Sequence, residues 1–138
     1  GNINNYGWPI SSYGDHYSFD LGKTEENKSK YEKAPLHKSH KKYGFVEPLK
    51  YFIPSIGISQ LVLMPTKFID SKNKMLLIGS MPAKKLLSIK LDNNNKIIYE
   101  ENISIGERIR DIIYVGDVNK IFLFLEDTAS IGVLSKPN

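Results

Sequence analysis

The 138 residues of this sequence include no cysteine. A disulfide framework, a thiolate nucleophile and a zinc site with cysteine ligands are therefore excluded. The cellular compartment stays open, because a secreted protein need not contain disulfides. Long apolar runs are also lacking. No stretch reaches the roughly 18 apolar residues of a membrane-spanning helix, so we expect no membrane span. The N-terminus has no basic and apolar signal pattern, and it does not resemble a natural start, so we expect a fragment of a longer protein.

Helical periodicity is the third absence, since no segment repeats its apolar residues at helical spacing over a useful length. Apolar residues make up 41% of the chain and charged residues 25%, which is typical of a globular protein. The net charge of +4 suits acidic ligands, but such a charge is also common in proteins that bind none. We therefore expect an all-β globular domain with a mildly basic surface.

Residues 1–47 are rich in Asn, Gly, Ser, Tyr and Lys, and this composition predicts a loop-rich region. Seven lysines and three glutamates lie within 23–43, where Tyr31 and Tyr43 are the only aromatics. That pattern favours a solvated loop, and we expect no nucleic-acid partner. His37 and His40 have the spacing of a helical metal site, but lysines surround them and no acidic ligand is near, so we expect no metal there.

From residue 48 to 138, short apolar runs alternate with turn-forming residues. These runs predict strands at Leu49–Ile53, Ser59–Met64, Met75–Ser80, Leu86–Leu91, Ile97–Ile103, Arg110–Val115, Ile121–Leu125 and Ser130–Leu134. Asp92–Asn95 and Gly116–Asn119 predict tight turns between them. Four strands followed by three resemble one antiparallel β-propeller blade and an incomplete second one. A two-sheet sandwich fits the strand count nearly as well.

The stretch Gly106–Asp111 places Arg108 and Arg110 two residues apart, immediately before an apolar run. Residues at this spacing point to the same face of a strand, so the two guanidinium groups are expected side by side. Two such forks suit a ligand that carries several carboxylates or phosphates. A solvated strand edge with two unrelated arginines is the simpler and more common explanation of the same spacing.

Several short motifs occur together in one order along the chain. They are Asn5-Tyr6-Gly7-Trp8-Pro9, Tyr13-Gly14-Asp15-His16-Tyr17, Pro54–Ser59, Leu76–Ser80 and Gly106–Asp111. This combination is similar to the C-terminal part of the soluble PQQ-dependent sugar dehydrogenases, the glucose/sorbosone dehydrogenase family. The resemblance spans nearly the whole chain. It implies a six-bladed β-propeller, of which this chain would hold about two blades.

The same resemblance implies an oxidoreductase that oxidises an aldose, with PQQ as hydride acceptor and calcium as Lewis acid. It places the catalytic histidine upstream of the matched region, so we assign no catalytic residue in this chain. It implies cofactor contacts at Arg108, Arg110, Tyr17, Ser80 and Met81. It also implies that the main-chain carbonyl of Tyr6 serves a calcium site.

One position departs from the family pattern, because Met81-Pro82 stands where the family usually has leucine and lysine. The missing lysine would neutralise PQQ charge, and Lys84 or Lys85 would have to replace it. A non-enzymatic propeller module with lost or altered cofactor binding is therefore the alternative function. By resemblance we expect a periplasmic or secreted protein. Because two blades leave sheet edges open, we expect the fragment to self-associate.

Overall fold

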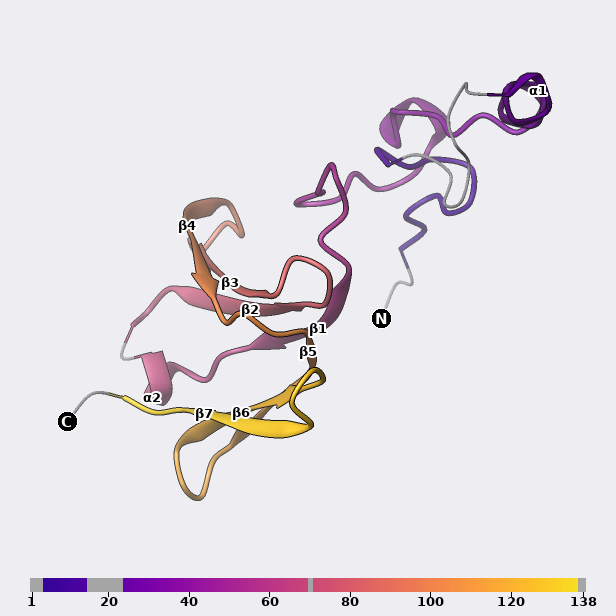
Figure 1. The fold of residues 1–138 in the computed structure, drawn as a ribbon. Coiled ribbons are helices and arrows are strands. Elements are labelled where there is room, and N and C mark those ends of the chain that lie inside the picture. Colours follow the sequence, from indigo (N-terminus) through magenta and orange to yellow (C-terminus); the bar gives the residue numbers. More distant parts are fainter. Residues whose placement is uncertain (1–3, 15–23, 70, 137–138) are drawn as a thin grey trace. The chain divides into compact units, whose positions relative to one another are not determined.

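A computed structural model of the chain describes residues 4–14, 24–69 and 71–136. The chain divides into two compact units, Gly1–Ser55 and Ile56–Asn138 (Figure 1). The first unit contains helix α1 (Glu25–Lys33) and the short 3-10 helix η1 (Lys41–Tyr43). In this unit, a parallel β-bridge joins Ser11, which precedes helix α1, to His37, which follows it.

Helix α1 lies in the region that was predicted to be rich in loops. Its sequence, EENKSKYEK, contains no apolar stripe, so helical periodicity could not reveal it. Glutamate and lysine are good helix formers, and two glutamates occupy the first turn, where the helix dipole favours negative charge. The helix therefore follows from residue propensity and end charges within the segment that was predicted to be a solvated loop.

The second unit is mainly β-structure, with one short helix, α2 (Thr66–Ile69). Its strands are β1 (Ile58–Leu63), β2 (Lys74–Ser80), β3 (Lys85–Leu91), β4 (Ile97–Ser104), β5 (Ile109–Val115), β6 (Lys120–Leu125) and β7 (Ser130–Leu134). They form two antiparallel meanders, β1-β2-β3-β4 and β5-β6-β7 (Figure 1). The all-β class and the pattern of one four-stranded blade followed by an incomplete one are thus confirmed.

Both predicted tight turns are present. Asn95 and Asn119 adopt positive φ angles of 62° and 50°, which asparagine tolerates better than most residues. The amide of Asn95 donates to the carbonyl of Asp92 at 3.0 Å, and that of Asn119 to the carbonyl of Gly116 at 3.3 Å. These hydrogen bonds close the β3–β4 and β5–β6 hairpins.

The predicted strand at Leu49–Ile53 is wrong, because this segment is irregular, with bends at both ends, and pairs with no strand in the described part of the chain. Proline residues stand on both sides of it, at positions 48 and 54, and proline cannot donate to a sheet ladder. Leu49 and Ile53 are exposed, and the ring of Tyr51 stacks on that of Tyr13 at 4.0 Å instead. The apolar residues of this segment therefore do not line a sheet face, and Tyr51 packs against a ring of the same unit.

The core of the second unit lies between its two sheets. The buried side chains that form it come from both meanders and from the segment after β1: Met64, Leu77, Leu86, Ile109, Ile112, Ile121 and Leu123. Helix α2 adds Phe68, whose ring meets that of Tyr114 edge-on at 5.7 Å. Because β5 supplies two core isoleucines, the segment that carries the arginine pair is fixed to the best-packed part of the unit.

Strand β7 is an edge of the three-stranded sheet, with no strand beyond it in the described part of the chain. Ile131 and Val133, two residues apart on this edge, are exposed. We expect the isolated chain to self-associate through such surfaces, and Ile131→Lys with Val133→Lys to reduce the effect, since charge on an edge strand opposes pairing. Light scattering against concentration measures this. A monomeric mass at high concentration would remove the idea.

Candidate functional site

The arginine pair lies at the start of β5, where the strand carries an irregularity. Ile109 pairs with Leu125 and Asp111 with Phe124, so Arg110 is an extra residue in β5. An inserted residue of this kind re-aims side chains and is common beside functional sites. As a result Ile109 and Ile112 are both buried while Arg110 is exposed. Strict two-residue alternation did not predict this arrangement.

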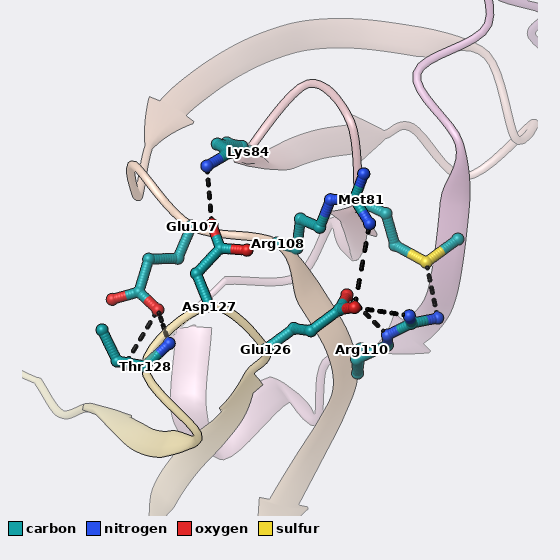
Figure 2. Close-up of polar contacts among 8 residues, drawn as sticks. All are labelled: Met81, Lys84, Glu107, Arg108, Arg110, Glu126, Asp127 and Thr128. Atoms are coloured by element: carbon teal, nitrogen blue, oxygen red, sulfur yellow. Dashed lines mark hydrogen bonds and ion pairs between the residues drawn. The ribbon is translucent and has the colours of Figure 1, made fainter.

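Arg110 contacts Glu126 and Met81 through its guanidinium group (Figure 2). Its Nη2 donates to Oε1 of Glu126 at 2.7 Å, and its Nε lies 2.7 Å from Oε2 of the same carboxylate. Its Nη1 donates to the sulfur of Met81 at 3.2 Å. Every nitrogen of this guanidinium group therefore has a partner within the chain. Paired contacts of this kind between arginine and a carboxylate are among the stronger polar interactions in proteins.

Arg108 reaches the same carboxylate more loosely, with Nη1 3.7 Å from Oε1 of Glu126. Its side chain is 44% exposed, and its guanidinium group makes no hydrogen bond within the described residues. Its main chain is held by the amide of Glu126, which donates to the Arg108 carbonyl at 2.9 Å. The two arginines therefore lie near one carboxylate of the chain itself, and only Arg110 is tightly bound to it.

A second ion pair lies beside the first (Figure 2). Nζ of Lys84, in the β2–β3 turn, is 2.6 Å from Oδ2 of Asp127. The Lys84 carbonyl also accepts hydrogen bonds from the amides of Ile105 and Gly106, both at 3.1 Å. We refer to Lys84, Arg108, Arg110, Glu126 and Asp127 as the charged cluster. Three positive and two negative side chains leave it with a net charge of +1.

The pKa values in the cluster follow these contacts. The hydrogen bond from Arg110 is the main cause that lowers the pKa of Glu126, and Coulomb attraction to both arginines adds to it. The hydrogen bond from Lys84 likewise lowers the pKa of Asp127. The pKa of Arg110 is raised by Glu126. Glu126 and Asp127 are therefore both ionised at neutral pH.

We expect the stabilising effect of Glu126 to depend on pH. Because its folded-state pKa is lowered, this contribution is complete above the ordinary glutamate pKa of about 4.3 and is lost as pH falls through the lowered value. The stability difference between wild type and Glu126→Gln should thus be constant near neutrality and shrink in acid. Urea unfolding between pH 7 and 3 measures it. In an Arg110→Gln background the difference should vary less with pH, and an unchanged dependence would contradict the assignment.

Met81 and Pro82 form the turn after β2, directly above Gly57. The amide of Met81 donates to the Gly57 carbonyl at 3.0 Å. Gly57 has φ +58°, and a Cβ there would lie 2.9 Å from Cγ of Pro82. Pro82, at the position that departs from the family pattern, therefore packs against backbone that only glycine leaves open.

Gly57→Ala is expected to be more destabilising than Gly106→Ala. Both glycines have positive φ, so each alanine pays about 1–2 kcal/mol of backbone strain. At Gly106 no atom lies within 4 Å of the added Cβ, whereas at Gly57 the collision with Pro82 adds about 1–3 kcal/mol. Urea unfolding of both variants measures the difference. Pro82→Ala should recover part of the Gly57→Ala loss, and equal losses in the two alanine variants would argue against the contact.

The other predicted site residues do not join the arginine pair in the described structure. Ser80 is fully buried, and its hydroxyl donates to the carbonyl of Ile56 at 2.8 Å, so it supports the turn from beneath. Tyr17 lies outside the described residues. Tyr6 belongs to the first unit, where its carbonyl lies 2.8 Å from Nδ1 of His40. Since a carbonyl only accepts, His40 is protonated on Nδ1.

The first unit has a pocket of about 450 Å³, which Tyr6, Trp8, Tyr13, His40 and Tyr51 help to line. His40 is buried, and its Nε2 has no hydrogen-bond partner among the residues that the structure describes. Glu47 braces this region by accepting hydrogen bonds from the hydroxyl of Tyr13 and the amides of His40 and Lys41. Among residues 4–14, 24–69 and 71–136, no three His, Asp or Glu side chains gather closely enough to hold a metal ion.

Glu126 is the residue that sequence reasoning missed. It lies 16 residues beyond Arg110, at the end of β6, and nothing in its local pattern marks it. The available signal was the hairpin itself, because a tight β5–β6 turn returns the end of β6 to the start of β5. Counting back across the predicted Gly116–Asn119 turn would have placed Glu126 opposite the arginine pair.

Known proteins resemble this chain in both sequence and structure. The family model for glucose/sorbosone dehydrogenases matches residues 2–132. The uncharacterized protein slr1608 of Synechocystis sp. is 30% identical over 108 residues, which are 78% of this chain and 23% of that protein. A crystal structure of glucose dehydrogenase matches with a TM-score of 0.69 at 25% identity, over 98% of this chain and 36% of its own. The chain thus spans well under half the length of either relative. It belongs to the glucose/sorbosone dehydrogenase family.

Proposed function

We propose that this chain is the C-terminal part of a sugar dehydrogenase and supplies one anion-binding wall of its site. Family membership supports an oxidoreductase-related domain. The observation that carries the proposal is that Arg108 and Arg110 lie together at the start of β5 with side chains that are 44% and 54% exposed. Preorganised guanidinium groups of this kind bind and orient a carboxylate ligand. The catalytic base and the sugar site would come from the rest of the protein.

Calcium, which the family resemblance implies, finds one compatible ligand here. The carbonyl oxygen of Tyr6 is a hard donor, and after its contact with His40 it keeps a second lone pair. The described residues offer no cluster of acidic side chains around it. A calcium ion at Tyr6 would therefore need its remaining ligands from elsewhere in the protein.

PQQ carries three carboxylates, and the residues described here do not fit all of them. All three nitrogens of Arg110 already contact Glu126 or Met81, so a ligand carboxylate could use only the two remaining N–H groups, beside the negative charge of Glu126. Pro82 cannot supply the positive charge of the family lysine. Lys84, the nearby substitute, is held by Asp127. Among the predicted cofactor contacts that the structure describes, Arg108 is the more loosely held charge, 3.7 Å from Glu126.

A second candidate function follows from that mismatch. We propose as the alternative a non-enzymatic propeller module that keeps the scaffold and has lost or altered its cofactor. The observations that favour it are the internal pairing of Arg110 with Glu126 and the packing of Pro82 on Gly57. Such a module would bind a sugar or another small ligand without oxidising it.

One assay separates the two candidates. The full-length protein is incubated with PQQ, calcium, an aldose and an electron-accepting dye. A dehydrogenase reduces the dye in proportion to the aldose, whereas a binding module takes up the sugar in calorimetry without dye reduction. Met81→Leu with Pro82→Lys restores the family pattern and is expected to increase PQQ retention after dialysis. Absence of both dye reduction and sugar binding would refute both candidates.

We also propose a periplasmic or secreted location, on the basis of the family resemblance. None of the helices in the described residues is long and apolar enough to cross a membrane. Fractionation of cells that express the full-length protein tests the location directly.

A further inference from the structure

We propose that Glu126 sets the charge of the ligand preferred at the arginine wall, so that the site favours a single carboxylate over a tricarboxylate. This inference rests on the proposed function, because it concerns the same wall. It goes further by naming a residue that determines specificity and the class of ligand that it selects. The ligand class is a molecule that presents a single carboxylate at this wall.

The first step is the occupation of Arg110. Its three nitrogens contact Oε1 and Oε2 of Glu126 and the sulfur of Met81. A ligand carboxylate that approached Arg110 would have to displace Glu126 or share the guanidinium group with it. Displacement would leave Glu126, whose side chain is only 31% exposed, without its closest cation. The pair is partly exposed, so breaking it costs little, but as long as Glu126 stays in place its negative charge opposes a second carboxylate at Arg110.

The second step is the availability of Arg108. It lies 3.7 Å from Glu126, forms no hydrogen bond through its guanidinium group in the described part of the chain, and is 44% exposed. Its main chain is nevertheless fixed, through the carbonyl that accepts from the Glu126 amide at 2.9 Å. A guanidinium group that is anchored by its backbone and uncommitted at its donors can bind one carboxylate in bidentate geometry.

The third step is the charge of the surroundings. The charged cluster has a net charge of +1, since Glu126 and Asp127 offset two of its three cations. One carboxylate matches this charge. A second and a third would face Glu126 at close range, and like charges about 4 Å apart repel enough to change affinity by roughly fivefold or more, even with the screening of water. The wall as built therefore discriminates by ligand charge.

The test compares two ligands built on the same ring, benzoate and benzene-1,3,5-tricarboxylate. Each is titrated into the full-length protein by calorimetry at constant ionic strength. The variants are Glu126→Gln, which frees Arg110, Glu126→Ala as a second means of doing so, and Glu107→Gln as the matched control. Glu107 lies in the β4–β5 loop, next to Arg108 in the sequence, but its carboxylate accepts hydrogen bonds from the amide and hydroxyl of Thr128 at 3.0 and 2.8 Å (Figure 2).

We expect the wild type to bind benzoate at least as well as the tricarboxylate. In Glu126→Gln and Glu126→Ala, the affinity ratio of tricarboxylate to benzoate should rise by about tenfold, while Glu107→Gln changes it by no more than about threefold. Circular dichroism confirms that each variant is folded. A wild type that prefers the tricarboxylate, a ratio unchanged in both Glu126 variants, or no benzoate binding would overturn the inference. Aldose oxidation is assayed separately, so failure of the proposed function would leave the titration result intact.

Discussion

Ile109→Ala is expected to lower the free energy of unfolding of the second unit by about 2–5 kcal/mol, the usual cost of such a cavity in a packed core. Ile109 is 0% exposed and packs in the cluster between the two sheets. Gly79 lies against Ile109, since a Cβ there would be 3.0 Å from its Cγ2, and Gly79 has no side chain that could move into the cavity. A thermal melt should therefore shift downward by on the order of 10 °C or more.

Ile113→Ala is the matched control, since it is the same change on the same strand at a residue that is 42% exposed. Its effect should remain within about 1 kcal/mol. Ile109 also lies between Arg108 and Arg110, so its loss should loosen both arginines as well as the core. Similar destabilisation by the two alanine substitutions would show that the core is not where we place it.

Arg108→Ala and Arg110→Ala are expected to have separable effects. Arg108 makes one long ion pair, so its loss should change stability little but weaken carboxylate binding by about 10- to 100-fold, the value of hydrogen bonds to a charged group. Arg110→Ala removes the close partner of Glu126, so it should lower stability as well. It should also weaken binding, because Arg108 is then drawn toward Glu126.

Calorimetric titration with benzoate and a thermal melt of each variant measure the two effects. Arg108→Lys keeps the charge but lacks the planar fork, and it should recover only part of the binding. If Arg108→Ala binds benzoate like the wild type, Arg108 is a solvated surface residue, as the simpler explanation of the arginine spacing holds.

The strands of the second unit were predictable because each combines an apolar run with a turn signal at its end. β3 and β4 meet at an Asp-Asn-Asn-Asn turn whose residues tolerate positive φ, so sequence fixes the hairpin locally. The segment 49–53 has the same apolar alternation but no partner strand in the described part of the chain. Whether such a segment becomes a strand depends on a partner in the tertiary structure, which the local sequence does not reveal. Helix α1 was missed for the opposite reason, since it has favourable residues but no apolar face.

The arginine pair was predictable as a candidate site, whereas the pairing of Arg110 with Glu126 was not. Spacing placed Arg108 and Arg110 together, and motif order suggested what they bind. The extra residue at Arg110 and the return of β6 to bring Glu126 beneath the pair depend on sheet register. Register is a property of two strands at once, so reading β5 alone could not reveal that Arg110 is already occupied.

The most direct measurement is a crystal structure of the full-length protein with benzene-1,3,5-tricarboxylate at the arginine wall. We predict that Arg110 remains paired with Glu126 at a distance near the 2.7 Å found here, and that a single ligand carboxylate lies on Arg108. A structure in which Arg110 has turned to a ligand carboxylate, with Glu126 displaced, would contradict the account.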